Sequence, residues 1–208
     1  MERVLNLIME LKKDPRVARA VNVKLEEFRK NGKKSRDEIF KELCFCILTA
    51  NFNAKKAIAI HEKIGDGFLT LSESQLASKL REFGYRYPNT RAHYIVEARR
   101  HIHDLMKALK SYEKDKLREW LVKNIKGLGY KEASHFLRNI GYRNYAIIDF
   151  HIIDVLVKYG LIERPDKLSK KEYFELENIL RRIAEKLDMN LAELDLYLWF
   201  SETGKILK

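Results

Sequence analysis

Hydrophobic residues recur along this chain at helical spacing, and no stretch alternates for long enough to require a β-sheet. Near the N-terminus, for example, Val4, Leu7, Ile8 and Leu11 fall on one face of an amphipathic helix. The pattern predicts an all-α fold. The expected helices cover residues 2–12, 15–30, 36–50, 54–64, 73–82, 90–109, 112–124, 130–140, 150–159, 170–187 and 191–203.

Residues that start and stop helices support these ranges. Asp14 followed by Pro15 is typical of an N-cap with proline at the first helical position. Sequences with capping-box spacing begin at Ser35, Ser72, Ser169 and Asn190. Glycines fall where helices are expected to end, at Gly65, Gly84, Gly141, Gly160 and Gly204.

Composition narrows the class of partner. Lys and Arg number 41 against 30 Asp and Glu, which gives a formal net charge of +11 and a pI near 9.5. Such a charge suggests a polyanionic partner such as nucleic acid, although a merely basic soluble protein would show it too. The basic residues are spread over the predicted helices, so a folded surface is the expected contact.

No apolar run approaches the length of a membrane span, and the N-terminal helix is not followed by a signal-peptide cleavage site. We therefore expect a cytoplasmic protein with no membrane partner. Cys44 and Cys46 are the only cysteines, and we expect both to be buried thiols. Two cysteines exclude a four-cysteine iron–sulfur cluster or a cysteine-rich zinc site within this chain.

The segment 124–152 carries the candidate chemistry. Gly127 and Gly129 lie between two predicted helices and form the tight link of a helix-hairpin-helix motif. Amide groups exposed at such a link can bind a DNA phosphate, which positions a protein on DNA without reading the bases.

Lys131 and Asp149 stand at the starts of the two helices that follow the link. Lys131 is either a solvated surface group or, if it is kept deprotonated, a nucleophile that attacks a sugar carbon and forms a Schiff base. Asp149 follows the apolar run Ala146-Ile147-Ile148 and is expected to cap its helix. An ionised carboxylate at that place could also stabilise positive charge on a sugar as its base departs.

The pattern GLGYK followed by AIIDFHI resembles the helix-hairpin-helix DNA glycosylase superfamily, in which such a lysine and aspartate are the catalytic pair. The stretches FGYRYPNTRAHYIVEAR and ELCFCILTANF and the ending LDLYLWFSETGKILK resemble the type 2 8-oxoguanine DNA glycosylase/AP lyase family. The match runs over most of residues 36–208. It implies a two-lobed helical bundle that forms a single glycosylase unit over residues 1–208. The central lobe would span about 36–145, and the N- and C-terminal helices would form the second lobe.

The resemblance also implies the reaction. The substrate would be double-stranded DNA containing 8-oxoguanine, with the target nucleotide flipped out of the duplex. Lys131 would displace the base, and the Schiff base would permit β-elimination on the 3′ side of the lesion. Asp149 would support the developing charge.

Further residues are placed by the same comparison. Asn51 would be the wedge that enters the duplex, while Asn53 caps the next helix. Tyr87 and Trp199 would sandwich the oxidised base, and Lys208 would reach the lesion pocket from a tail that could otherwise be a frayed terminus. No metal and no cofactor are expected, apart from a monovalent cation that carbonyls of the hairpin could hold. We expect a monomer.

Two other functions fit part of the pattern. A non-catalytic helix-hairpin-helix DNA-binding module would explain the charge and the hairpin but not Lys131 and Asp149. A glycosylase for oxidised pyrimidines would keep the same pair and change the base pocket.

Overall fold

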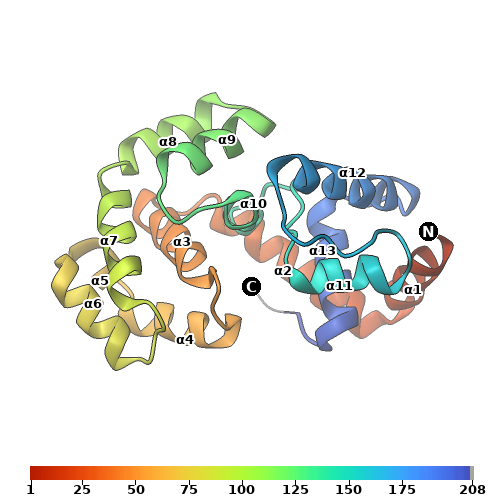
Figure 1. Cartoon of the computed structure of the whole chain (residues 1–208), viewed down its shortest axis with the longest axis horizontal. Helices are drawn as coiled ribbons and strands as arrows, with labels where there is room; N and C mark the ends of the chain where they lie inside the picture. Colours follow the sequence, from red (N-terminus) through yellow and green to blue (C-terminus); the bar gives the residue numbers. More distant parts are fainter. Residues whose placement is uncertain (207–208) are drawn as a thin grey trace. The chain divides into compact units, whose positions relative to one another are not determined.

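Every regular element is an α-helix in the computed structural model, which describes residues 1–206 and, for Lys114, the backbone only (Figure 1). The predicted all-α class is confirmed. None of the described helices is both long enough and apolar enough to span a membrane. The helices are α1 (Glu2–Lys13), α2 (Pro15–Asn31), α3 (Arg36–Thr49), α4 (Ala54–Ile64), α5 (Gly67–Thr70), α6 (Glu73–Glu82), α7 (Pro88–Arg99), α8 (Ile102–Ser111), α9 (Lys114–Asn124), α10 (Tyr130–Asn139), α11 (Phe150–Lys158), α12 (Lys170–Lys186) and α13 (Leu191–Thr203).

Side-chain caps begin many of these helices where the sequence predicted them. Asp14 accepts a hydrogen bond from the amide of Arg16, and Pro15 occupies the first position of α2. Full capping boxes are present at Ser72 and Ser169. The side chains of Ser35, Asn53 and Asn190 cap α3, α4 and α13. Each cap satisfies an amide that has no partner within its helix.

One predicted helix is wrong, and one helix was not predicted. Residues 90–109 form two helices, α7 and α8, because the amides of Arg100 and His101 bond to carbonyls three residues back. The additional helix is the short α5. It is fixed by the Arg99 side chain of α7, which donates to the carbonyls of Gly67, Phe68 and Leu71 at 3.2, 2.6 and 2.5 Å. A contact across so many residues leaves no local sequence signal.

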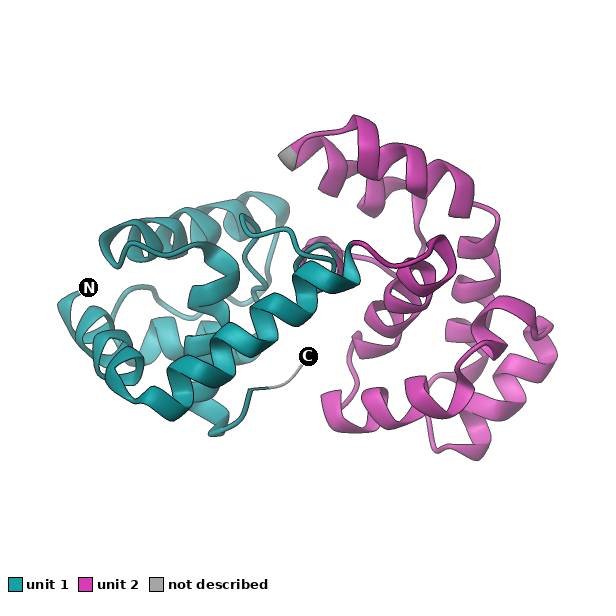
Figure 2. Ribbon diagram, turned by 180° about the vertical axis from the view of Figure 1, so that it is seen from behind, with its two compact units in different colours: residues 1–32, 137–208 teal, residues 33–136 magenta. Residues whose placement is uncertain are grey.

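The chain forms two compact units, coloured separately in Figure 2. Unit 1 comprises residues 1–32 and 137–208, and unit 2 comprises residues 33–136. Helix α10 begins in unit 2, and its last three residues belong to unit 1. Lys131 is therefore a residue of unit 2 and Asp149 a residue of unit 1.

Helix α3 is the core helix of unit 2. Residues 43–49 are all buried, and α3 contacts α4, α5, α7 and α8. A helix that is apolar on all sides has to be covered on all sides. Cys44 and Cys46 lie in this buried stretch as free thiols, as predicted, and burial raises the pKa of the Cys44 thiol.

Helix α13 has the same place in unit 1, where it contacts α1, α2, α11 and α12. Its buried residues include one charged side chain, Asp195, which accepts a hydrogen bond from Arg138 of α10. The Arg138 guanidinium lies 4.8 Å from the centre of the Phe28 ring of α2. The backbone at Gly32 also lies close to that of Ile140: a Cβ added to Gly32 would be 2.2 Å from the carbonyl oxygen of Ile140. The ion pair thus joins α10, α13 and α2.

Burial sets the protonation of this pair. Asp195 is 8% exposed, and burial raises its pKa to about 6. The loss of hydration outweighs the positive charge of Arg138, which lowers this pKa, and the negative charge of Asp149 raises it further. An unfolded aspartate has a pKa of about 3.9, so the folded protein holds this proton more tightly. The folded state gains stability from this tighter binding. The gain is complete below the pKa of Asp195 in the unfolded chain and is lost as pH rises through about 6.

We expect the stability of Asp195→Asn relative to the wild type to depend on pH. The side-chain amide of the variant imitates the protonated acid at every pH. The measured quantity is the free energy of unfolding of the wild type minus that of the variant, and this difference should fall by about 1.3 kcal/mol from pH 5 to pH 7. Urea unfolding at both pH values measures the difference. Asp154→Asn, which alters a more exposed aspartate paired with Arg164, is the matched control and should show no such trend. A difference that grows with pH would mean that the ion pair outweighs desolvation.

Candidate functional site

A helix-hairpin-helix motif is present in unit 2, where α9 and α10 are joined by residues 125–129. Gly127 has a φ of +87°, a left-handed conformation that favours glycine. A Cβ at this position would lie 2.6 Å from Cδ2 of Tyr94 in α7. Glycine is therefore required at position 127 both by the turn and by the aromatic ring packed against it.

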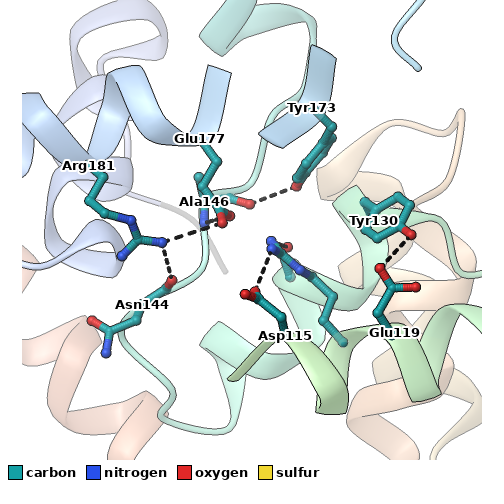
Figure 3. Close-up of polar contacts among 10 residues, drawn as sticks. Asp115, Glu119, Tyr130, Asn144, Ala146, Tyr173, Glu177 and Arg181 are labelled. Atoms are coloured by element: carbon teal, nitrogen blue, oxygen red, sulfur yellow. Dashed lines mark hydrogen bonds and ion pairs between the residues drawn. The ribbon is translucent and has the colours of Figure 1, made fainter. Parts of the chain in front are cut away.

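The two helices of the hairpin are joined by polar side chains, some of which are shown in Figure 3. Arg118 of α9 is fully buried and donates to the Ser134 hydroxyl of α10 at 3.1 Å and to Asp115 at 3.2 Å. The Tyr130 hydroxyl donates to Glu119 at 2.8 Å. These contacts fix the first turn of α10 against α9.

That first turn contains the candidate nucleophile. Lys131 is half-buried, and its Nζ lies 3.0 Å from Oε1 of Glu132. The other carboxylate oxygen of Glu132 accepts a hydrogen bond from the amide of Gly129 at 3.2 Å. Glu132 therefore binds both the amine and one of the amides that the sequence suggested for phosphate binding.

Asp149 begins α11 in unit 1. Its carboxylate accepts a hydrogen bond from the amide of Ile152 at 3.0 Å, which confirms the predicted cap. The side chain is half-buried, and residues 145–148 before it are buried in a segment without regular structure. Buried backbone groups outside a helix need other partners.

Helix α12 supplies those partners (Figure 3). The Tyr173 hydroxyl donates to the carbonyl of Ala146 at 2.7 Å, and the amide of Ala146 donates to Glu177 at 3.0 Å. Arg181 donates to Glu177 at 3.4 Å and to the carbonyl of Asn144 at 3.3 Å. The three α12 side chains are spaced four residues apart, on one face of the helix. Their contacts hold the segment that leads into Asp149.

An aromatic group adjoins Asp149 in unit 1. The His151 ring lies 3.9 Å from that of Phe150 and 4.7 Å, edge to face, from that of Trp199 in α13. Phe150 is 64% exposed, an unusual state for a phenylalanine. The Trp199 indole N–H is buried and has no acceptor among residues 1–206. Unit 1 thus brings together Asp149, His151 and Trp199.

The remaining predicted residues are in unit 2 or outside the described residues. Asn51 is exposed in the turn between α3 and α4, with a φ of +55°. Tyr87 is the N-cap residue of α7 and is 43% exposed, with the Arg86 guanidinium 5.0 Å from its ring centre. Lys208 lies outside the described residues.

Within residues 1–206 no group of three or more His, Cys, Asp and Glu side chains could hold a metal ion.

Two kinds of site residue were not predicted from the sequence. Glu132 could have been found, because it stands three residues after Gly129, the spacing at which a glutamate reaches back to the start of its helix. The α12 residues that hold the segment before Asp149 could not have been found from the sequence. They are distant in sequence from that segment, and their spacing is that of an ordinary polar helix face.

Known proteins similar to this chain identify its family. The sequence model of the family described as 8-oxoguanine DNA glycosylase matches residues 21–189. A protein of Korarchaeum cryptofilum named 8-oxoguanine DNA glycosylase/AP lyase is 52% identical over 210 residues, covering 100% of this chain and 99% of its own.

Solved structures are similar over the whole length. The crystal structure of Methanocaldococcus jannaschii 8-oxoguanine glycosylase/lyase in complex with a 15mer DNA containing 8-oxoguanine has a TM-score of 0.95 and 49% identity, covering 99% of this chain and 100% of that one. The 8-oxoguanine DNA glycosylase of Thermotoga maritima has a TM-score of 0.92 and 41% identity, covering 100% and 99%. The resemblance seen in the sequence is confirmed, and the chain belongs to the 8-oxoguanine DNA glycosylase family.

Proposed function

We propose that this protein excises 8-oxoguanine from double-stranded DNA and then cleaves the strand 3′ to the abasic site through a Schiff base on Lys131. The observation that carries the proposal is the position of Lys131: a half-buried amine in the first turn of α10, directly after the hairpin, in a chain of this family. The activities are those in the relatives' names, glycosylase and AP lyase. The monomeric state and the cytoplasmic location stay predictions.

DNA binding follows from charge and from the hairpin. The net charge of +11 favours a polyanion, and its effect on affinity should weaken as salt rises. The hairpin turn at Gly127, with the exposed Lys126 beside it, is suited to a backbone phosphate. The M. jannaschii relative was crystallised with DNA that contains 8-oxoguanine, and we extend that ligand to this chain.

The chemical steps start at Lys131. The neutral amine attacks C1′ of the flipped nucleotide, and the bond from C1′ to the base breaks with its electron pair leaving on the base, which gains a proton. The sugar ring opens as an imine forms. Loss of a C2′ proton then breaks the bond from C3′ to the phosphate oxygen, and water releases the lysine. Glu132, 3.0 Å from Nζ, is within reach to accept a proton from the ammonium group.

Asp149 stabilises the positive charge that the sugar gains as the base departs. Its bond to the amide of Ile152 orients the carboxylate, and α12 fixes the segment before it. Preorganised charge of this kind costs no rearrangement at the moment of reaction. Helix capping and charge stabilisation are compatible roles for one carboxylate.

Recognition of the base is proposed for Tyr87, Trp199 and Lys208. The exposed Tyr87 ring and the Trp199 ring beside His151 are aromatic faces of the kind that stack on a flipped base. Lys208 would meet the edge at which 8-oxoguanine carries an N–H where guanine has an acceptor. Asn51 would fill the space left in the duplex.

We expect Lys131→Gln to lose base excision and strand cleavage while still binding DNA, because an amide cannot form the imine. The loss should be on the order of a thousandfold or more, as when other enzymes lose a nucleophile. Single-turnover release of 8-oxoguanine and gel analysis of the strand measure both steps. Lys116→Gln, which alters an exposed lysine near the start of α9, at the end of that helix away from the turn, should leave the chemical rates near wild type. Full activity in Lys131→Gln would assign the chemistry to another amine.

We expect Asp149→Asn to slow base release by about a hundredfold without unfolding the protein. Asparagine caps a helix about as well as aspartate, so the melting temperature should change little, whereas the lost charge removes transition-state stabilisation. The matched control is Asp14→Asn, the same change at the cap of α2, and it should affect neither rate nor stability strongly. Normal excision by Asp149→Asn with a much lower melting temperature would show that Asp149 is only a cap.

A further inference from the structure

The turn that carries Asn51 has an uncommon backbone. Asn51 has a φ of +55°, and it is one of only two non-glycine residues with positive φ among residues 1–206. Asparagine tolerates this left-handed conformation better than most residues, but the conformation persists only where the surroundings hold it. The side chain of Asn51 is exposed, so the restraint must act on its neighbours.

Arg91 of α7 binds one of those neighbours. Its side chain is buried at 8% exposure, and Nη2 donates to the carbonyl oxygen of Ala50 at 3.0 Å. Its Nε donates to the Tyr85 hydroxyl at 3.3 Å, and that hydroxyl donates to the carbonyl oxygen of Leu48 at 2.6 Å. Burial raises the pKa of Tyr85, so the phenol stays protonated and remains a donor. Both carbonyls lie at the C-terminal end of α3, where helical partners are missing.

The other side of Asn51 is held by the same group of residues. The ring of Phe52 lies 4.3 Å from the ring of Tyr85. Ala50 is thus fixed by Arg91 and Phe52 by Tyr85, with Asn51 between them.

Helix α7 also contacts the hairpin between α9 and α10. Tyr94 stands one turn after Arg91, and the Arg91 guanidinium lies 5.6 Å from its ring centre. The Tyr94 ring packs against Gly127, as described above, and Glu97 lies 3.9 Å from Lys126 in the same turn. One face of α7 therefore contacts both the turn at Asn51 and the turn at Gly127 within unit 2.

We propose that Arg91 is a positioning residue that holds Asn51 in the conformation in which it enters the duplex, and that α7 keeps this wedge at a fixed distance from the hairpin. The inference rests on the proposed function, because a wedge has a purpose only in an enzyme that flips a base. Arg91 is buried, so its guanidinium acts through the carbonyl of Ala50.

Arg99 provides a matched control on the same helix. Its guanidinium also donates to carbonyl oxygens, those of Gly67, Phe68 and Leu71, but these belong to α5 and its end and not to the wedge turn. Arg91→Met and Arg99→Met therefore both remove guanidinium bonds to backbone carbonyls, but only Arg91→Met removes one at the wedge turn. Arg91→Lys restores a single donor and should recover part of the lost function, and Tyr85→Phe offers a milder test if Arg91→Met does not fold.

The experiment compares two substrates under single-turnover conditions: a fully paired duplex with 8-oxoguanine, and a duplex in which the lesion lies in a bubble of unpaired nucleotides. A wedge assists only where the base must be unstacked and unpaired. We expect Arg91→Met to slow excision from the paired duplex by about tenfold or more, the effect of one charged hydrogen bond, with little change on the bubble. Asn51→Ala should show the same pattern, and the double variant should lose no more than the worse single variant.

The outcomes separate the two claims. Equal losses on both substrates, a substrate preference shared by Arg99→Met, or additive effects of Arg91→Met and Asn51→Ala would overturn the role of Arg91 and leave the proposed function standing. A wild type that releases 8-oxoguanine from neither substrate would overturn the proposed function and this inference with it.

Discussion

The buried pair of Arg138 and Asp195 is the contact on which the architecture of unit 1 depends. It joins the end of α10 to α13 and places the guanidinium over Phe28 of α2. Desolvation determines the protonation of this pair, because it raises the pKa of Asp195 above that of an ordinary aspartate despite the adjacent Arg138 cation. Because the charge of Asp149 contributes to the same shift, the pair and the candidate catalytic carboxylate are electrostatically linked. The unit that positions Asp149 therefore also places its charge close enough to act on the buried pair.

Unit 2 uses arginine for a similar purpose. Arg91, Arg99 and Arg118 donate to backbone carbonyls or hydroxyls of neighbouring elements, and Arg91 and Arg118 are buried. The guanidinium group suits this task because it carries several donors in a rigid plane and remains charged. Part of the excess positive charge therefore fixes turns and is not available to DNA, so the net charge of +11 overstates the charge that can meet phosphates.

The sequence predicted most of the helices and the presence of the hairpin because both have local signals. Caps such as Asp14 and Ser169 mark helix starts within four residues, and the glycine link followed by Lys131 is a short motif. Features built by distant contacts were not predictable. The break between α7 and α8, the short α5 held by Arg99, and the hold of α12 on the segment before Asp149 depend on residues that meet only in the folded chain. The roles proposed for Tyr87, Trp199 and Lys208 came from family resemblance and not from any pattern of spacing.

The measurement that tests the central claim most directly is the identification of the residue that becomes attached to DNA. Wild-type protein is incubated with a duplex containing 8-oxoguanine in the presence of borohydride, which reduces an imine to a stable amine, and the adduct is digested and mapped by mass spectrometry. We predict one modified peptide, with the sugar remnant on Nζ of Lys131. Attachment to another lysine or to the N-terminal amine, or no adduct while strand cleavage proceeds, would contradict the assignment of Lys131 as the nucleophile.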